Sequence, residues 1–261
     1  MGKIVKPKIF LIGESKVNID GLNELMHHLG APDWKSDAPS DIELLCEVFG
    51  RACYKSFGTN LNPNVTRVRK TSKSYLTNII EKGDGSILEH GVANFFISDV
   101  SRAFTHELVR HRVGTAISQE SLRFVRLTDL NWYAPVSIQE SPEAMTIFTK
   151  TMEDLSRIQK ELATLFELDE QPDFAVKKEI TSAMRRIAPI GLATNIGWSC
   201  NMRILRNVIE QRTAPWAEEE IRLVFGEIGR IAVERWPNLF ADYRVEIQDG
   251  LPVYITDNRK V

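Results

Sequence analysis

The spacing of apolar residues predicts helices in the first half of the chain and one clear strand. Apolar positions recur at helical spacing in "DIELLCEVFGRACYKS" (41–56), with Ser40 or Asp41 as the cap, and in "SKSYLTNIIEKG" (72–83), which Gly83 ends. "HGVANFFISDV" (90–100) is rich in Val, Phe and Ile and predicts a strand of roughly six to eight residues. "SRAFTHELVRHR" (101–112) follows it and is typical of a helix capped by Ser101.

The second half of the chain is predicted to be mostly helical. Residues 142–168 carry one apolar stripe, which suits a helix bundle or a contact between subunits. The stripe consists of Met145, Phe148, Met152, Leu155, Ile158, Leu162 and Leu165. Shorter helices are predicted over 174–189, where Pro189 ends the helix, and over 201–212 and 214–236. A strand near the middle and helices at the end favour an α+β fold.

A single domain over residues 1–261 is the simplest organisation. Residues 29–41, "LGAPDWKSDAPSD", are the most loop-like stretch, and residues 1–40 are predicted to be an N-terminal extension or loop region. The apolar run "IFLIG" is too short for a signal sequence or a membrane span. We therefore expect a cytoplasmic protein without membrane contact.

The charge and the cysteines exclude several classes of protein. The net charge is -2, whereas a protein that binds nucleic acid through its phosphates normally carries a basic excess. Cys46, Cys53 and Cys200 form no C-x-x-C pair, so we expect neither disulfides nor a zinc site and interpret all three as small buried thiols. The glycine motifs of dinucleotide and P-loop sites are absent from the sequence, and no metal site is expected.

Cations gather in "RHRVGTAISQESLRF" (110–124), which contains a single acid, Glu120. The planar guanidinium of arginine suits phosphate and carboxylate groups. Arg110 and Arg112 would point to nearly opposite sides of a helix. Either the helix unwinds here, or the two side chains reach different ligands or different subunits. The alternative is local pairing with Glu107, which would contribute about 0.2–0.5 kcal/mol for each pair.

Two further arginine clusters strengthen the case for an anionic ligand. In "NMRILRNVIEQR" (201–212), Arg203 and Arg206 are three residues apart and would repel each other unless an anion lies between them. Asn201, Arg203 and Asn207 would share one helix face, which suits a polar, flat or phosphorylated ligand. Arg185 and Arg186 precede Pro189. Three such clusters in a slightly acidic protein indicate a polyanionic small molecule.

These clusters, in this order, resemble the flavin-dependent thymidylate synthases. The signature of that family is R-H-R, followed by S-x-R and an aromatic residue, and Arg110–Arg112, Ser121, Arg123 and Phe124 supply it here. Further similar segments are "RACYKSF", "ILEHG", "MRRIAP" and the sequence from "NMRILRN" to "AEEEIR". The resemblance spans roughly residues 42 to 235. It implies an α+β fold with a central, mostly antiparallel sheet flanked by helices and a helix-rich C-terminal half.

The chain departs from the usual family pattern at a few positions. The spacing between Arg112 and Ser121 is one residue longer than the commonest pattern, and "VGTAI" is expected to absorb the extra residue in a bulge or a looser turn. Phe124 replaces a tyrosine, Asp84 a histidine and Glu107 a glutamine. The last two residues would border the folate and nucleotide side of the pocket.

The resemblance implies methylation of dUMP at uracil carbon 5, with FAD as redox cofactor and methylene-tetrahydrofolate and NADPH as co-substrates. It also implies that no catalytic cysteine is needed and that a homotetramer forms its sites at subunit junctions. A flavin-dependent methylase of UMP in secondary metabolism is the first alternative. A non-catalytic nucleotide- or RNA-binding module is the second.

The resemblance assigns roles to individual residues. Catalysis would depend on electrostatic activation of uracil, with Arg185, Arg212 and Ser121 as catalytic residues. A nucleophilic role for Ser121 would need a base such as His111 within reach. The residues expected to bind the flavin cofactor are Ser56, Ser86, Glu89, Arg110, His111, Arg112, Asn201, Arg203 and Asn207. Those expected to bind substrate are Glu107, Gln119, Ser121, Arg123, Arg185 and Arg212.

Overall fold

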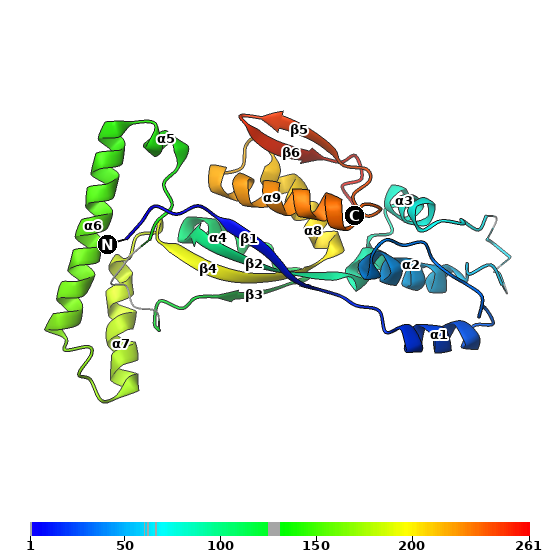
Figure 1. Cartoon of the computed structure of the whole chain (residues 1–261), viewed down its shortest axis with the longest axis horizontal. Helices are drawn as coiled ribbons and strands as arrows, with labels where there is room; N and C mark the ends of the chain where they lie inside the picture. The colour runs from blue at the N-terminus through cyan, green and yellow to red at the C-terminus, as the bar shows by residue number, and fades with distance from the viewer. Residues whose placement is uncertain (1, 60, 62, 66, 125–130) are drawn as a thin grey trace. The chain divides into compact units, whose positions relative to one another are not determined.

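The computed structural model describes residues 2–59, 61, 63–65, 67–124 and 131–261 (Figure 1). The chain divides into two compact units, each assembled from separate segments. Unit 1 comprises residues 1–10, 96–111 and 117–198, and unit 2 comprises residues 11–95, 112–116 and 199–261. The single-domain organisation stays a prediction.

A four-stranded antiparallel sheet runs in the order β1-β2-β4-β3. This confirms the predicted α+β class with a central antiparallel sheet and flanking helices. The strands are β1 (Lys8–Glu14), β2 (Val92–Ser101), β3 (Thr115–Gln119) and β4 (Ala193–Asn201). Only β2 was predicted, and it is longer than expected. β4 buries every second residue, with Asn195, Gly197 and Ser199 between them, so its period-2 alternation was a strand signal that the helical prediction for this half of the chain overlooked.

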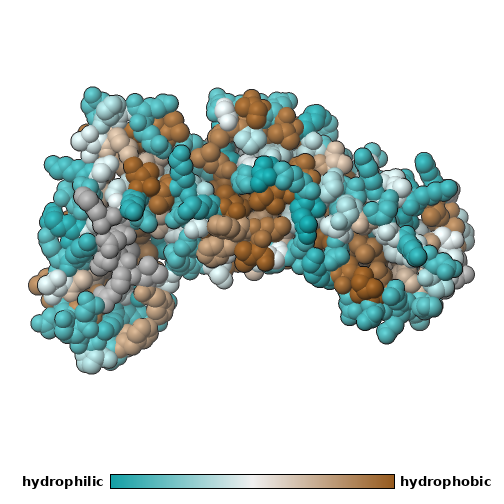
Figure 2. All heavy atoms as spheres, viewed as in Figure 1, coloured by the Kyte–Doolittle hydropathy of each residue, from teal (hydrophilic) through white to brown (hydrophobic). Residues whose placement is uncertain are grey.

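The helices of unit 2 begin and end at residues that cap them. They are α1 (Ile19–His28), α2 (Asp41–Tyr54), α3 (Ser72–Lys82), α8 (Met202–Thr213) and α9 (Glu219–Arg235), with the 3₁₀ turn η1 (Gly85–His90). Ser40 caps α2, and Gly83 ends α3 at a φ of 76°, as predicted. α9 begins later than predicted, because the carboxylate of Glu218 accepts the N–H groups of Glu220 and Ile221. In Figure 2, hydrophobic residues show at the surface where α1 meets α2.

β1 and α1 correct the expectation that residues 1–40 are an extension or loop region. β1 is a strand of the sheet, and α1 packs through Met26 against Val48 of α2. Residues 30–40, which follow α1, contain no helix or strand, in agreement with the predicted loop.

Unit 1 carries the remaining helices. They are α4 (Arg102–Leu108), α5 (Val136–Gln139), α6 (Pro142–Leu165) and α7 (Phe174–Met184), with the 3₁₀ turn η2 (Arg185–Ile187). Ser101 caps α4 as predicted, but the helix ends at Leu108, four residues before the predicted end. The apolar stripe of α6 is only partly covered within one chain: Met152 is buried, whereas Leu165 is 73% exposed.

The cysteine interpretation is correct at two of three positions. Cys46 and Cys200 are buried, but Cys53 is exposed in the last turn of α2, so its predicted burial is wrong. Among the residues that the structure describes, no helix is both long and apolar enough to span a membrane.

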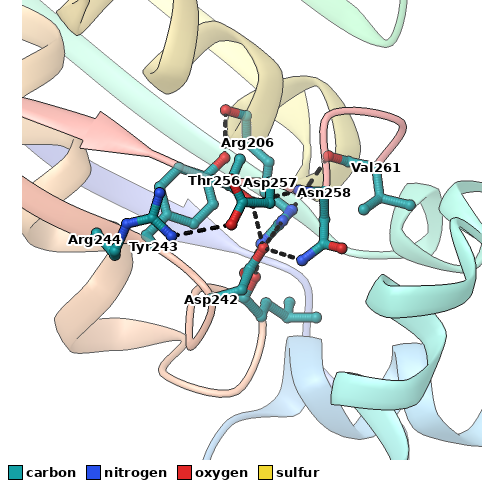
Figure 3. Close-up of polar contacts among 9 residues, drawn as sticks. Arg206, Asp242, Tyr243, Arg244, Thr256, Asp257, Asn258 and Val261 are labelled. Carbon is teal, nitrogen blue, oxygen red and sulfur yellow. Dashed lines mark hydrogen bonds and ion pairs between the residues drawn. The ribbon is translucent and has the colours of Figure 1, made fainter.

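A buried ion pair holds the C-terminal segment against α8 (Figure 3). Arg206 is fully buried, and two of its nitrogens donate to the two carboxylate oxygens of Asp242 at 2.8 Å. Its Nε donates to the carbonyl of Val261, and the Asp242 carboxylate also accepts from Thr256 and Asn258. The charge of Arg206 is therefore balanced by a structural carboxylate of the fold.

The hairpin formed by β5 (Arg244–Gln248) and β6 (Leu251–Ile255) lies within this segment. Gln248 pairs with Leu251, and the two residues between them, Asp249 and Gly250, both have positive φ, at 55° and 75°. An Asp-Gly dipeptide is the preferred sequence for such a two-residue turn. It was the sequence signal from which this hairpin could have been predicted.

We expect the Asp242–Arg206 pair to stabilise the protein in a pH-dependent way. Burial raises the pKa of Asp242, but the hydrogen bonds and charge of Arg206 outweigh it and lower the pKa from 3.8 to about 2. Because the folded-state pKa is depressed, the stabilisation is complete above about pH 4 and is lost as the pH falls towards 2. Asp242→Asn should therefore lower the free energy of unfolding at pH 7 by about 2 kcal/mol or more.

Urea denaturation at pH 7 and near pH 2.5 measures this effect. The difference between wild type and variant should shrink at the lower pH. Asp257→Asn is the matched control, because Asp257 pairs with Arg244 at the surface of the same segment and is 81% exposed. Equal losses from both substitutions would contradict the role assigned to Asp242.

Candidate functional site

A cavity of about 230 Å³ lies beside the N-terminal half of α8 in unit 2. Four of the residues predicted to bind the cofactor line it together, namely Glu89, Asn201, Arg203 and Asn207. Arg259 and Lys260 add further positive charge. We refer to this space as the α8 cavity. Glu89 and the residues of α8, more than a hundred positions apart in sequence, are brought together here.

The start of α8 fixes how these side chains are presented. Asn201 ends β4 and caps α8, and its side-chain oxygen accepts the N–H of Ile204 at 2.9 Å. Arg203 and Asn207 follow at a spacing of four residues and share one helix face. Arg203 Nη1 lies 2.7 Å from a carboxylate oxygen of Glu89, and both side chains are about half exposed. This pair orients a guanidinium at the cavity while leaving it accessible.

Two glycines allow the close approach of these groups. A Cβ at Gly85 would lie 2.6 Å from Nε of Arg203, and a Cβ at Gly114 would lie 2.4 Å from Nδ2 of Asn201. Gly114 also has a φ of 67°, which L-residues rarely adopt. The N–H of Asn201 donates to the carbonyl of Gly114 at 3.0 Å. The Val113–Gly114 turn is therefore packed against the N-cap of α8, and Val113 itself lines the cavity.

The Arg110–Arg112 segment lies beyond the end of α4. Arg110 and His111 donate their backbone N–H groups to Glu107 and Leu108, and the chain then leaves the helix. Of the geometries left open by the sequence, unwinding of the helix is the one observed. Arg112 is exposed and stands directly before Val113 of the α8 cavity.

A second group of charged residues gathers in unit 1. Nη2 of Arg102 donates to the carbonyl of Glu120 at 2.8 Å, while its buried Nε has no hydrogen-bond partner among the described residues. Burial lowers the pKa of Arg102, the charge of Glu120 opposes this, and the charge of Arg185 lowers it further. Arg102 is therefore subject to the charges of both Glu120 and Arg185, and its buried Nε remains open to an acceptor. We call this the Arg102–Arg185 cluster.

Asn195 holds the acidic side chain of this cluster. Its backbone and side-chain N–H groups donate to the two carboxylate oxygens of Glu120 at 3.1 and 2.8 Å. Sequence reasoning missed Arg102, Glu120 and Asn195 as site residues. Glu120 was recognisable as the only acid of its segment, whereas nothing in the sequence pairs Arg102 with Arg185.

Comparisons with known proteins match most of the chain to one family. The family model of the thymidylate synthase complementing protein matches residues 36–238. The chain belongs to this family. The predicted resemblance is thereby confirmed. A flavin-dependent thymidylate synthase of Mycolicibacterium vanbaalenii is 35% identical over 84% of this chain and 87% of its own length. Proteins of the same name from Corynebacterium efficiens and Mycobacterium marinum are 34% and 35% identical, each over 86% of this chain and 90% of their own length.

The end of the family's signature segment rests on α7. Ser121 accepts the N–H of Arg123 at 3.3 Å, and Thr181 of α7 donates to the carbonyl of Arg123 at 2.9 Å. Phe124, where the family usually has tyrosine, stacks on Phe174 at 5.9 Å between ring centroids. This stacking holds the ring of Phe124 against α7.

Several predicted site residues lie elsewhere. Ser56 lines a different cavity, and Ser86 is exposed on η1. Gln119 donates through its side chain to the hydroxyl of Thr105 at 3.0 Å, and Glu107 belongs to α4. Arg212 lies in the last turn of α8, outside the lining of the α8 cavity. Among the described residues, no cluster of His, Cys, Asp and Glu could hold a metal ion.

The geometry at Gly114 makes a testable prediction for this member of the family. Gly114→Ala should cost ~1–2 kcal/mol of unfolding free energy from its positive φ, and more because the new Cβ would displace Asn201 from the α8 N-terminus. Gly250→Ala is the matched control, because Gly250 also has positive φ but a Cβ there would meet no described atom within 4 Å. Chemical denaturation of both variants should show the larger loss for Gly114→Ala. Equal losses would exclude the proposed contact.

Proposed function

We propose that this protein synthesises dTMP by reductive methylation of dUMP at uracil carbon 5, with FAD as cofactor and methylene-tetrahydrofolate and NADPH as co-substrates. The observation that carries the proposal is the convergence of Glu89, Asn201, Arg203 and Asn207 on the α8 cavity. The names of the relatives support it, since they are flavin-dependent thymidylate synthases.

The chemistry of the α8 cavity fits a flavin. A flavin ring presents both N–H donors and carbonyl acceptors along one edge, and the two asparagines offer both kinds of group. Arg203 supplies a fixed positive charge, and Gly85 and Gly114 keep the surrounding backbone close to the side chains without Cβ atoms in the way. When bound, FAD would carry reducing equivalents from NADPH to the transferred carbon. The residues of the chain would bind and orient it.

The size of the α8 cavity supports an assembly in which several subunits share one site. Pockets that bury a whole ligand have volumes of about 300–1,000 Å³, whereas the α8 cavity has about 230 Å³. We propose that one chain contacts only part of FAD and that Arg110, His111 and Arg112 complete the site of a neighbouring subunit in a homotetramer. The half-covered stripe of α6 is an additional surface available for subunit contact.

The Arg102–Arg185 cluster is the proposed site for the phosphate of dUMP. An anion here would provide a partner for the buried Nε of Arg102 and would counter the charge of Arg185. Ser121 and Arg123 would add contacts from the adjoining turn. Arg212 would stabilise negative charge that develops on the uracil carbonyls during methyl transfer.

The two buried cysteines are poor candidates for a thiolate that activates uracil. Burial raises the pKa of Cys46 to about 12 and that of Cys200 well above its usual value. Neither thiol therefore ionises near neutral pH. This agrees with the proposed electrostatic activation of the substrate.

The first test is spectroscopic and kinetic. The purified protein, reconstituted with FAD, should be yellow and should oxidise NADPH faster when dUMP is present. Radiolabelled methylene-tetrahydrofolate should transfer its label to dTMP. Turnover of UMP in place of dUMP would identify the alternative acceptor, and salt-dependent RNA binding without flavin uptake would overturn the proposal.

Arg185 and Arg186 form a matched pair for testing the phosphate site. Both are exposed in η2, but Arg185 is the neighbour whose charge acts on Arg102. A hydrogen bond to a charged group contributes about 1.5–3 kcal/mol, so Arg185→Gln should lower kcat/KM for dUMP by about tenfold or more. Arg186→Gln should leave it within about twofold, and flavin absorbance should be unchanged in both variants. A similar loss from both substitutions would refute a specific role for Arg185.

A further inference from the structure

A second cavity, of about 300 Å³, lies between the C-terminal end of α2 and α3 in unit 2. It is lined by cationic side chains from both helices and from the segment before α3, namely Arg51, Arg67, Arg69 and Lys82. None of the described residues that line it is acidic. We call it the cationic cavity. An ordinary charged surface mixes both signs, so a concave region of one sign attracts counter-ions.

Arg51 forms the rigid wall of the cationic cavity. It is 2% exposed, and its Nε donates to Glu47 at 2.8 Å. Its other nitrogens donate to the carbonyls of Ser56 at 3.0 Å and Arg69 at 2.9 Å. Since Glu47 balances the charge of Arg51, the unbalanced charge of the cavity comes from Arg67, Arg69 and Lys82. Arg51 also fixes the backbone on either side of the cavity.

Polar groups inside the cavity are arranged to receive a ligand. Ser56 is 7% exposed, and its buried hydroxyl has no hydrogen-bond partner among the described residues. A buried hydroxyl is normally hydrogen-bonded, so an unpartnered one at a cavity wall points to a missing acceptor or donor. Asn78 accepts a hydrogen bond from Nη2 of Arg69 and thereby orients that guanidinium.

The lining residues of the cationic cavity and of the α8 cavity contact two adjacent residues of the chain, Asp84 and Gly85. Tyr54, which lines the cationic cavity, donates its hydroxyl to Asp84 at 2.8 Å. The next residue, Gly85, lies against Arg203 of the α8 cavity. A ligand that reacts at the α8 cavity could therefore extend a tail past Asp84 towards Arg67, Arg69 and Lys82.

We propose that the cationic cavity is an anion-binding subsite for the charged tail of a co-substrate. This inference rests on the proposed function, because that function supplies co-substrates with suitable tails. The shared chemistry is a group with two or more negative charges, either the glutamate carboxylates of a folate or the phosphates of a nicotinamide dinucleotide. Arg67, Arg69 and Lys82 pair with the charges, and the Ser56 hydroxyl donates to one of the oxygens.

Direct binding to the intact protein tests the subsite without relying on turnover. Calorimetry with inorganic pyrophosphate and with γ-linked triglutamate should show saturable binding that weakens as salt is raised from 50 to about 300 mM. The Arg67→Gln/Lys82→Gln double variant should bind at least about tenfold more weakly. Both side chains are exposed, so the variant should fold, which circular dichroism checks. Arg157→Gln is the matched control, since Arg157 is a surface arginine of α6 paired with Asp154 and Glu161.

Kinetics then identify the source of the anion. If the tail belongs to the folate, the double variant should raise KM for triglutamyl methylene-tetrahydrofolate about tenfold and leave KM for the monoglutamyl form within about twofold. If it belongs to the dinucleotide, KM for NADPH should rise instead. Equal binding of both probes to wild type and double variant would overturn the subsite, whether or not the protein makes dTMP. If the wild-type protein makes no dTMP but binds both probes, and the double variant loses that binding, the subsite stands and only the proposed function is overturned.

Discussion

The junction between β4 and α8 is the constraint on which the candidate site depends. Asn201 ends the strand, caps the helix and packs against Gly114, whose carbonyl accepts the N–H of Asn201. The N–H of the next residue, Met202, donates to the carbonyl of Gly91, directly before β2. One asparagine therefore sets where α8 starts, which residues share the face of Arg203, and how the segment after Arg112 returns to the sheet. A small change at this junction would move several cavity residues together.

Two groups of arginines in this protein differ in what surrounds them. Arg51 and Arg206 are buried, and each donates to a carboxylate and to backbone carbonyls, so they serve the fold. Such pairs are expensive to desolvate and are retained where all their hydrogen bonds are made. Arg102, Arg185 and the cations around Ser56 are incompletely partnered or lie near other cations. A buried polar group without a hydrogen-bond partner among the described residues, Nε of Arg102 or the hydroxyl of Ser56, is the property that both proposed anion sites share.

Much of the helical framework could be predicted from local sequence signals. Ser40, Ser101 and Gly83 mark helix ends through hydrogen bonds and backbone angles that depend only on nearby residues. Most strands were not predicted, although β4 alternates buried and polar residues and Asp249-Gly250 marks a hairpin, and the pairing order of the sheet could not be predicted because strand partners are distant in sequence. Cys53 was misjudged for a related reason: helical spacing identifies a face but does not show whether another element covers the last turn of α2.

The order of arginine, histidine, serine and asparagine residues along the chain was enough to determine the family, because ligand-binding chemistry needs those side chains at fixed spacings. Only the tertiary structure decides which of these side chains stabilise the fold and which remain accessible to a ligand. Arg203 and Arg206 stand three residues apart on one helix, yet one lines the α8 cavity and the other is buried against Asp242. The physical reason is that the electrostatic environment of a guanidinium is set by groups distant in sequence. Asp242, Asn195 and Gly114 become neighbours of these sites only when the sheet and helices have packed.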